Sequence, residues 1–156
     1  MSAKNLVQAL ESALADTYAL YLKTQNYHWN IMGTDFHQLH IMLEGQYREL
    51  IEPVDSLAER IRALGKHAPG SFSAFAKLTH IEEAMQAADA AEMIKDLYAD
   101  QEKIIKTMHH ALEEADKVKD VVTVDLLTQR IAAHEKNHWM LGATLNKAHA
   151  KVSHAA

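Results

Sequence analysis

The stretch from about residue 35 to residue 64 carries two chemically different faces, and it constrains the fold more than any other feature of the chain. Its apolar residues recur at helical spacing and, at about 100° per residue, they fall on one side of a helix. They are Leu39, Leu43, Leu50, Val54, Leu57, Ile61 and Leu64. A second set falls within a sector of about 100° that adjoins this stripe: His40, Glu44, Asp55, Glu59 and Arg62. The stripe predicts a side that faces the core of a helical bundle.

The helix before it is predicted over residues 3–31. Leucines at positions 6, 10 and 14, followed by Tyr21 and His28 at seven-residue steps, give the recurrence of one helical face. Gly33 is expected to form the turn, and Thr34 or Asp35 to cap the next helix through a side-chain oxygen.

Pro53 lies inside the second helix and lacks a backbone donor, which predicts a kink or a break near residues 49–52. Gly65 is expected to end that helix. Residues 66 to about 89 then contain Pro69 and Gly70 and predict a long crossover, in which Phe72 and Phe75 could anchor a short helix.

Asp89 and Glu92 form a variant of the capping box, which predicts a third long helix to about residue 117. Asp120 or Thr123 is expected to start the fourth, which runs to about residue 149. Short loops join the first pair and the last pair of helices, and one long crossover joins the pairs. We therefore predict an all-α fold, a ferritin-like four-helix bundle whose crossover carries a short extra helix, with residues 1–156 as a single domain.

Composition supports helix and narrows the function. Two prolines and five glycines interrupt 156 residues, and 48% of the chain is hydrophobic. No cysteine is present, so any metal ligands must be imidazoles and carboxylates. No apolar run reaches the ~20 residues of a membrane span and no secretory signal is visible, so we expect a soluble cytoplasmic protein with no membrane partner. The net charge of −5 argues against broad electrostatic capture of nucleic acid, although eleven histidines soften this at low pH.

His28, His40, Asp55 and Glu59 are the ligand types that iron or zinc would choose. On a straight helix, Asp55 lies ~22 Å along the axis from His40, so one chain cannot gather all four. Two chains can, if this helix meets its own copy antiparallel across a two-fold axis near residues 48–49. The spacing therefore predicts a metal site at a homodimer interface.

Each residue also has a plainer interpretation. Either histidine could be an ordinary helix residue, with His40 bonded to Glu44 one turn on, while Glu59 could pair with Arg62 and Asp55 could simply be solvated. The joint occurrence of four potential ligands in a matching helical phase favours the metal site.

Many fixed spacings in the chain resemble those of the Dps family, the DNA-protection-during-starvation miniferritins. The resemblance is densest over residues 27–65: Tyr27-His28-Trp29-Asn30, Gly33, Phe36, Leu39-His40, Leu43-Glu44, Tyr47, Asp55, Ala58-Glu59-Arg60-Ile61-Arg62 and Leu64-Gly65. It implies a hollow dodecamer with ferroxidase centres at two-fold interfaces, where His28 and His40 come from one subunit and Asp55 and Glu59 from its partner. Glu44 matches the position of an additional acid in the family.

The resemblance also implies a function. Iron would be oxidised from Fe(II) to Fe(III), preferably by hydrogen peroxide, and stored as mineral, which protects DNA from oxidative damage; zinc or another divalent ion could substitute. Trp29 could supply an electron when one iron is bound, or be a partly buried packing residue. Asp120 and Asp125 match the region of the family's three-fold pores, although acids also suit a helix's first turn. Glu49 and Glu52 are candidate cavity acids.

Two other functions remain open. Glu135 and His138 form a Glu-x-x-His motif of the kind used by intrachain di-iron centres, and His134 and His138 are a possible chance metal pair, but the rest of such a centre is missing. The alternative class is a DNA-coating protein with incidental metal binding. Family members that bind DNA generally use lysine-rich tails, whereas this chain offers Lys4 near its start and, near its end, Lys147, His149, Lys151 and His154. We expect DNA binding to be weak or absent at neutral pH.

Overall fold

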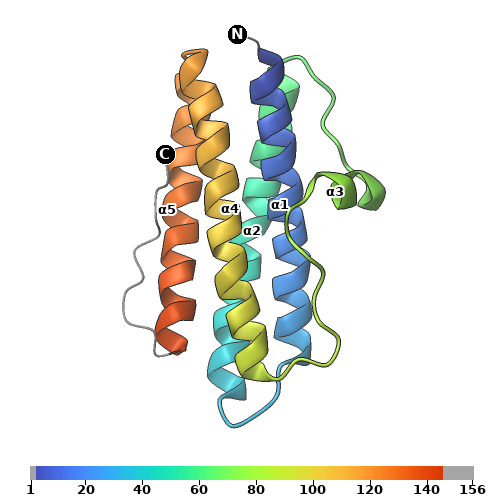
Figure 1. Cartoon of the computed structure of the whole chain (residues 1–156), viewed down its shortest axis with the longest axis vertical. Coiled ribbons are helices and arrows are strands. Elements are labelled where there is room, and N and C mark those ends of the chain that lie inside the picture. Colours follow the sequence, from blue (N-terminus) through green and yellow to red (C-terminus); the bar gives the residue numbers. More distant parts are fainter. Residues whose placement is uncertain (1–2, 146–156) are drawn as a thin grey trace.

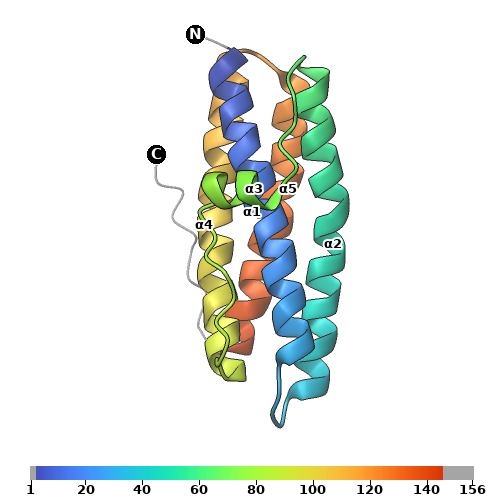
Figure 2. The same cartoon turned by 90° about the vertical axis from the view of Figure 1, so that its right-hand side faces the viewer.

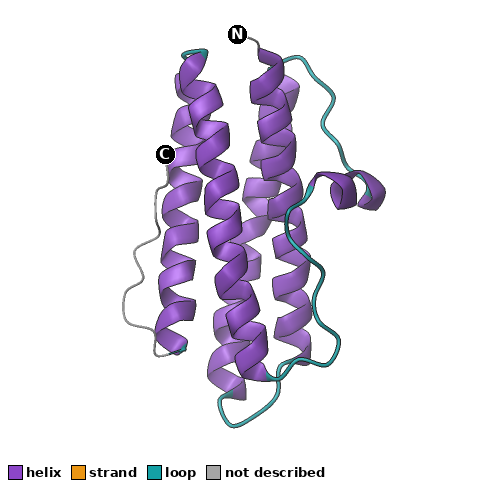
Figure 3. Ribbon diagram, in the orientation of Figure 1, coloured by secondary structure: helices purple, strands orange, loops and turns teal. Residues whose placement is uncertain are grey.

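The computed structural model describes residues 3–145, which form helices joined by loops and contain no strand (Figure 3). Four long helices and one short one follow in chain order (Figure 1). Their bounds are α1 Ala3–Asn30, α2 Phe36–Ala63, α3 Phe72–Leu78, α4 Ala90–Lys117 and α5 Val121–Thr144. The all-α prediction is confirmed, and so is the short helix in the crossover.

The four long helices form two antiparallel hairpins, α1 with α2 and α4 with α5. The crossover runs the length of the bundle from the end of α2 to the start of α4, so those two helices point the same way (Figures 1 and 2). This is the connectivity of a ferritin-like bundle. The α1–α2 hairpin packs against the α4–α5 hairpin on one side, and the crossover lies beside α1.

The core confirms the apolar stripe predicted for α2. Leu43, Leu50, Leu57 and Ile61 have no exposed surface, and Leu39 keeps 8%. Leucines of α1 face the same core. Val54 and Leu64 are partly buried against the same core. Because the stripe faces the core, the adjoining sector of α2 with the candidate ligands lies toward the surface.

The helix ends follow local signals that the sequence carries. Asp89 accepts from the backbone N–H of Glu92, whose side chain accepts in return from the N–H of Asp89, so the predicted capping box is complete. Gly65 has φ +80°, and it and Lys66 donate back to carbonyls of the last turn of α2, as in a Schellman ending. Asp35 stands at the N-cap position of α2, but its side chain makes no capping hydrogen bond there, which corrects the expectation for that cap.

The expected break near Pro53 is wrong, because α2 is helical without interruption from Phe36 to Ala63. Pro53 is itself buried, and Leu50 and Leu57 on either side of it are fully buried. Packing on both sides therefore holds the helix through the missing backbone donor. α5 is capped at its start by Asp120 as predicted and is described to Thr144, so its expected end near residue 149 lies outside the described residues.

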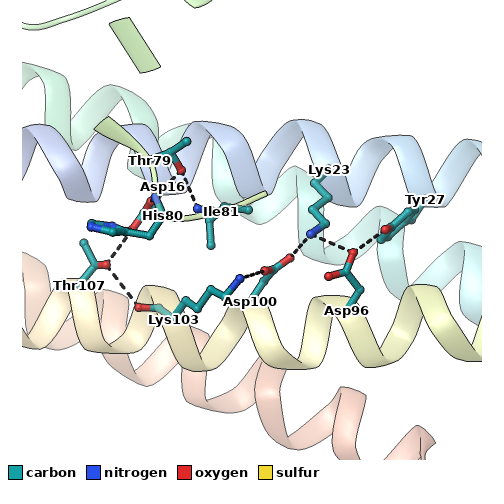
Figure 4. A network of polar contacts seen from close by, with 10 residues as sticks. All are labelled: Asp16, Lys23, Tyr27, Thr79, His80, Ile81, Asp96, Asp100, Lys103 and Thr107. Atoms are coloured by element: carbon teal, nitrogen blue, oxygen red, sulfur yellow. Dashed lines mark hydrogen bonds and ion pairs between the residues drawn. The ribbon is translucent and has the colours of Figure 1, made fainter. Parts of the chain in front are cut away.

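The crossover is tied to α1 by polar and aromatic contacts. The carboxylate of Asp16, fully buried, accepts hydrogen bonds from the hydroxyls of Thr79 and Thr107 and from the backbone N–H of His80 (Figure 4). The ring of Phe75 in α3 lies 4.9 Å from that of Tyr18. Phe75 is thus the anchor that the sequence suggested, whereas Phe72 remains 77% exposed.

None of the helices in the described part of the chain is both long and apolar enough to cross a membrane.

Candidate metal centre

His28 and His40 hold each other in a reciprocal arrangement. Nδ1 of His28 donates to the backbone carbonyl of His40, and Nδ1 of His40 donates to the carbonyl of His28, both at 2.8 Å. Since a carbonyl can only accept, each Nδ1 must carry the proton, and in each neutral ring the lone pair lies on Nε2. Metal-binding histidines are oriented in this way, by a hydrogen bond at the nitrogen that does not bind the metal.

The two rings are stacked, with centroids 3.7 Å apart and planes 19° from parallel. His28 lies in the last turn of α1, where backbone carbonyls lack a helical partner, so the bond from His40 also satisfies the helix end. Tyr47 presents its ring edge to His28 at 5.1 Å, and Phe36 lies 5.0 Å from His40. The hairpin thus fixes both imidazoles before any ligand arrives.

Asp55 and Glu59 stand on the exposed surface of α2, one turn apart. Neither makes a hydrogen bond or an ion pair within the described residues, and the suggested partner of Glu59, Arg62, donates instead to the carbonyl of Lys66. Asp55 lines an open hollow of ≈560 Å³ on this face. Two carboxylates with no partner on one helical face are free to bind a cation.

Glu44 lies one helical turn after His40 on the same sector of α2. Its Oε1 accepts a hydrogen bond from Nε of Arg48 at 2.8 Å and forms an ion pair with Nη2 of Arg48, also at 2.8 Å. The plainer expectation that His40 bonds to Glu44 is wrong, since His40 uses its Nδ1 on the carbonyl of His28.

The described residues, 3–145, contain no group of three or more His, Cys, Asp or Glu close enough to hold a metal ion. His40 shares a sector of α2 with Asp55 and Glu59, but Asp55 lies ~22 Å from it along the helix axis, and His28 stands beside His40 from the end of α1. Each is therefore a half-set of ligands within this chain.

Exposed apolar side chains accompany these half-sets. On α1, Leu22 and Trp29 are seven residues apart on one face and are 45% and 61% exposed. On α2, Ile51 lies between the histidine and the acids on the ligand sector and is 46% exposed. Within the single chain, Trp29 is an exposed side chain. Apolar surface beside unpaired ligands is typical of a face that a partner covers.

Sequence reasoning missed a buried network between α1 and α4. Nζ of Lys23, with its side chain 2% exposed, lies 2.9 Å from Asp96 and 2.6 Å from Asp100, and the hydroxyl of Tyr27 donates to Asp96 (Figure 4). Burial raises the pKa of Asp100, and Lys23 opposes that rise. The available signal was a lysine in the apolar phase of residues 3–31 and two acids four apart in residues 90–117.

The residues of the intrachain alternative do not form a centre. His134 is fully buried and donates through Nδ1 to Gln101, and burial with Arg130 nearby lowers its pKa to about 3. His138 stacks on Tyr98 at 4.1 Å and bonds to Glu102. These histidines thus have structural partners within the bundle.

The acids suggested by the sequence for pores and for the cavity differ in whether another side chain already binds their carboxylates. Asp120 caps α5 and accepts two hydrogen bonds from Arg60; burial raises its pKa, but the bonds from Arg60 and Thr123 outweigh this and lower it. Asp125 is exposed and accepts only from Gln129. Glu49 is ion-paired with Arg130, whereas Glu52 is exposed on the surface.

The basic residues considered for DNA contact near the chain's end, Lys147, His149, Lys151 and His154, lie outside the described residues.

Comparison with known proteins is consistent with this geometry. The model of the ferritin-like domain family matches residues 7–150. The DNA protection during starvation protein of Helicobacter pylori is 34% identical over 139 residues, covering 88% of this chain and 96% of that protein.

Two solved structures extend the likeness to the fold. Dps from Thermosynechococcus elongatus superposes with a TM-score of 0.89 at 28% identity over 97% of this chain and 96% of its own. The Dps protein of Vibrio cholerae, described as a member of a broad superfamily of ferritin-like diiron-carboxylate proteins, gives a TM-score of 0.86 at 34% identity over 91% of this chain and 89% of its own. The chain therefore belongs to the ferritin-like domain family and, within it, to the Dps proteins.

Proposed function

We propose that this protein oxidises Fe(II) at centres shared between two copies and stores the ferric product in a shell of like subunits. His28 and His40 of one copy bind the metal, and Asp55 and Glu59 of the second complete its coordination. The observation that carries the proposal is the contrast between two imidazoles already fixed with Nε2 available and two exposed carboxylates without partners. Membership of the Dps family supports the iron chemistry.

The ligand types suit the substrate. Carboxylates stabilise Fe(II) and Fe(III), and neutral imidazole is a good ligand for iron. Two Fe(II) ions each give one electron to one hydrogen peroxide, which takes up two protons and leaves as two waters, so no hydroxyl radical is released. The reciprocal hydrogen bonds keep both imidazoles in the required tautomer. Zinc or another divalent ion would occupy the same ligands without being oxidised.

The two-fold contact supplies what one chain lacks. If α2 meets its copy antiparallel about residues 48–49, each histidine pair lies opposite the partner's acids, and Ile51 with Trp29 is covered at the same time. We propose twelve subunits in the complete shell. A sizing or scattering measurement of the assembled particle tests this number separately from the two-fold contact.

Complementation between inactive variants tests the shared centre. One variant carries His28→Ala and His40→Ala and the other carries Asp55→Asn and Glu59→Gln, and peroxide is added to protein loaded anaerobically with Fe(II). Each variant alone should oxidise iron slowly. Particles assembled from an equal mixture should recover about a quarter of the wild-type centres, because half of the randomly paired dimers contain one intact centre.

An intrachain centre would give no recovery in the mixture, since every chain lacks part of its ligands. Equal oxidation by wild type and by the double histidine variant would remove the assignment altogether. Particles mixed after separate assembly are the matched control, because their subunits do not form new dimers.

Three supporting roles belong to the same proposal. Trp29 stands beside His28 and, exposed in the single chain, can give an electron to a bound oxidant when one iron is present. Asp125 offers the freer carboxylate for an entry pore, while the charge of Asp120 is already balanced by Arg60. Glu52 is the freer candidate for contact with stored mineral, since Glu49 is paired with Arg130.

The alternative function is protection of DNA by direct coating, and the name of the Helicobacter pylori relative favours a role in DNA protection. We propose that protection comes mainly from removal of iron and peroxide, because the chain carries a net charge of −5. Mobility-shift titrations at pH 6 and pH 8 over several salt concentrations test this. Tight binding at pH 8 would favour direct coating of DNA.

A further inference from the structure

A groove of ≈750 Å³ lies between the first third of α1, the crossover and the second half of α4. It is lined by residues drawn from 5–12 of α1 and from 103–114 of α4, and by His80 of the crossover. Ser12 stands 16 residues before His28, which is ~24 Å along a helix. The groove is therefore separate from the candidate metal centre.

The wall that α4 contributes to the groove carries basic side chains. Lys103, Lys106 and His110 follow one another at steps of three and four residues, so they share one face of the helix. Lys106 and His110 are exposed, and Lys106 makes no hydrogen bond or ion pair within residues 3–145. In a chain whose net charge is −5, this wall is a local concentration of basic groups.

The acids beside this wall already have cations of their own. Glu114, the acid that lines the groove, lies 2.6 Å from Nζ of Lys117. Asp100 is fully buried and lies 2.6 Å from Nζ of Lys23, against 3.6 Å from Nζ of Lys103. Neither acid therefore cancels the positive charge of the groove.

His80 is held by a buried carboxylate beneath it (Figure 4). Asp16 has no exposed surface; its Oδ2 accepts a hydrogen bond from Nδ1 of His80 at 3.1 Å, and its Oδ1 accepts from the backbone N–H of His80 at 2.6 Å. The hydroxyls of Thr79 and Thr107 also donate to Asp16. Nε2 of His80 is thus the nitrogen left for a ligand, on a side chain that is 62% exposed.

We infer that this groove binds a short chain of linked phosphate groups, as in inorganic triphosphate or the tail of a nucleoside triphosphate. Phosphate oxygens accept from lysine ammonium and from imidazolium groups, and such charged contacts are stronger than neutral ones. From Lys103 to His110 the basic groups extend over ~10 Å of helix, which is farther than one phosphate group reaches. A chain of phosphates can contact them in succession.

The opposite wall of the groove carries neutral groups. Gln8 and Ser12 of α1 line it, and their amide and hydroxyl can donate to phosphate oxygens. The two walls belong to helices that pack against each other, with axes about 8–10 Å apart. A DNA duplex, whose major groove alone is about 12 Å wide, cannot enter between them, whereas a phosphate chain can. The groove therefore fits a small phosphate-bearing ligand better than it fits DNA.

Calorimetric titration of the assembled full-length protein with sodium triphosphate tests the site. The protein is free of metal and a chelator is present, so that no divalent ion bridges ligand and protein. We expect saturable binding, and about tenfold weaker binding of inorganic monophosphate, which makes fewer charged contacts.

Three variants locate the binding in the groove. Lys103→Gln with Lys106→Gln should weaken triphosphate binding about tenfold, because two charged contacts are lost from a partly exposed site. Lys106→Gln alone should weaken it about threefold, and this variant leaves every described contact of the protein in place. His80→Gln should also weaken it about threefold.

Lys95→Gln with Lys136→Gln is the matched control, because it removes the same charge from exposed positions that do not line the groove. Its affinity for triphosphate should stay within about twofold of wild type. Absence of saturable binding, or an equal loss in the control, would overturn the inference. It would also be overturned if duplex DNA bound more tightly than triphosphate and lost the same affinity in the Lys103→Gln, Lys106→Gln variant.

Comparison of two ligands identifies the source of the phosphates. Equal affinities for inorganic triphosphate and a nucleoside triphosphate would mean that the phosphate chain alone is recognised. Tighter binding of the nucleotide would add a contact with its sugar or base, and either result supports the site. The variant with His28→Ala and His40→Ala should bind triphosphate as wild type does, so failure of the proposed metal centre would leave this inference standing.

Discussion

Two pairs of acids in this protein share one spacing and have opposite surroundings. Asp96 and Asp100 stand four residues apart on α4, and Asp55 and Glu59 stand four apart on α2. The α4 pair is turned inward, where Lys23 lies within 3 Å of both carboxylates. The α2 pair is exposed and has no partner within the described residues.

The difference shows that the partner of an acid pair, rather than its spacing, decides its role. Inside the bundle a fixed ammonium neutralises the carboxylates, so they stabilise the contact of α1 with α4. On the surface, the carboxylates remain available to a cation that arrives from outside. An unpaired acid pair beside exposed apolar residues therefore supports the metal site and the second subunit that we propose.

Removing the internal cation should have the largest effect. Lys23→Met leaves the buried carboxylate of Asp100 with only the more distant Lys103, at 3.6 Å, and leaves the half-buried Asp96 without Lys23. It should cost about 3 kcal/mol of the free energy of unfolding, measured by denaturant titration. Adding Asp96→Asn and Asp100→Asn should recover a substantial part of the loss. A Lys23→Met variant as stable as wild type would show that this network does not hold the bundle together.

Substitution of the exposed acids, Asp55 and Glu59, should reduce activity rather than stability. Asp55→Asn with Glu59→Gln should slow Fe(II) oxidation by about tenfold to a hundredfold while changing the unfolding free energy of the subunit by no more than about 0.5 kcal/mol. Stopped-flow absorbance measures the oxidation rate, and denaturant titration measures the unfolding free energy. Comparable loss of stability in this variant and in an Asp96→Asn, Asp100→Asn variant would erase the contrast between the pairs.

The buried histidine of the interior should also make the free energy of unfolding fall at acid pH. The pKa of His134 is about 3 in the fold and about 6.5 when unfolded, so the unfolded chain binds the proton more tightly. Stability from this group is present above pH 6.5 and is lost as the pH falls toward 3, by an amount on the order of a few kcal/mol.

Unfolding titrations at pH 7, 5.5 and 4.5 check this, with His134→Gln as the comparison. The variant should lose less stability than wild type over the same interval, because it has no imidazole to protonate. Parallel pH profiles would assign the acid sensitivity to other groups.

Asp89 should give the smallest effect of these predictions. It is an exposed acid whose side chain accepts a hydrogen bond from the backbone N–H of Glu92. Asp89→Ala removes the N-cap of α4 and should cost about 1 kcal/mol of unfolding free energy, measured by thermal or denaturant unfolding. Asp89→Asn should lose much less, since the amide oxygen can still cap. An alanine variant without any loss would mean that neighbouring contacts already hold the helix start.

Local sequence relations predicted the helices and much of their detail. The apolar stripe of α2, the capping box at Asp89, the N-cap at Asp120 and the turn at Gly65 all depend on residues within about five positions of one another. Such local relations can be recognised in the amino-acid sequence alone. Pro53 does not break α2 as its local effect allowed, since Leu50 and Leu57 on either side of it are buried in the core of the bundle.

The sequence by itself determined which residue types are available as candidate ligands and that His40, Asp55 and Glu59 share one face of a helix. Only the tertiary structure decided that His28 and His40 orient each other, that Lys23 neutralises the inner acids and that Arg48 holds Glu44. The physical reason is that helical phase follows from short spacings, whereas the partner of a polar group depends on side-chain orientation and, for distant residues, on how helices pack. In the sequence, an unpaired acid pair and an ion-paired one have the same spacing, and only the packing of the helices distinguishes them.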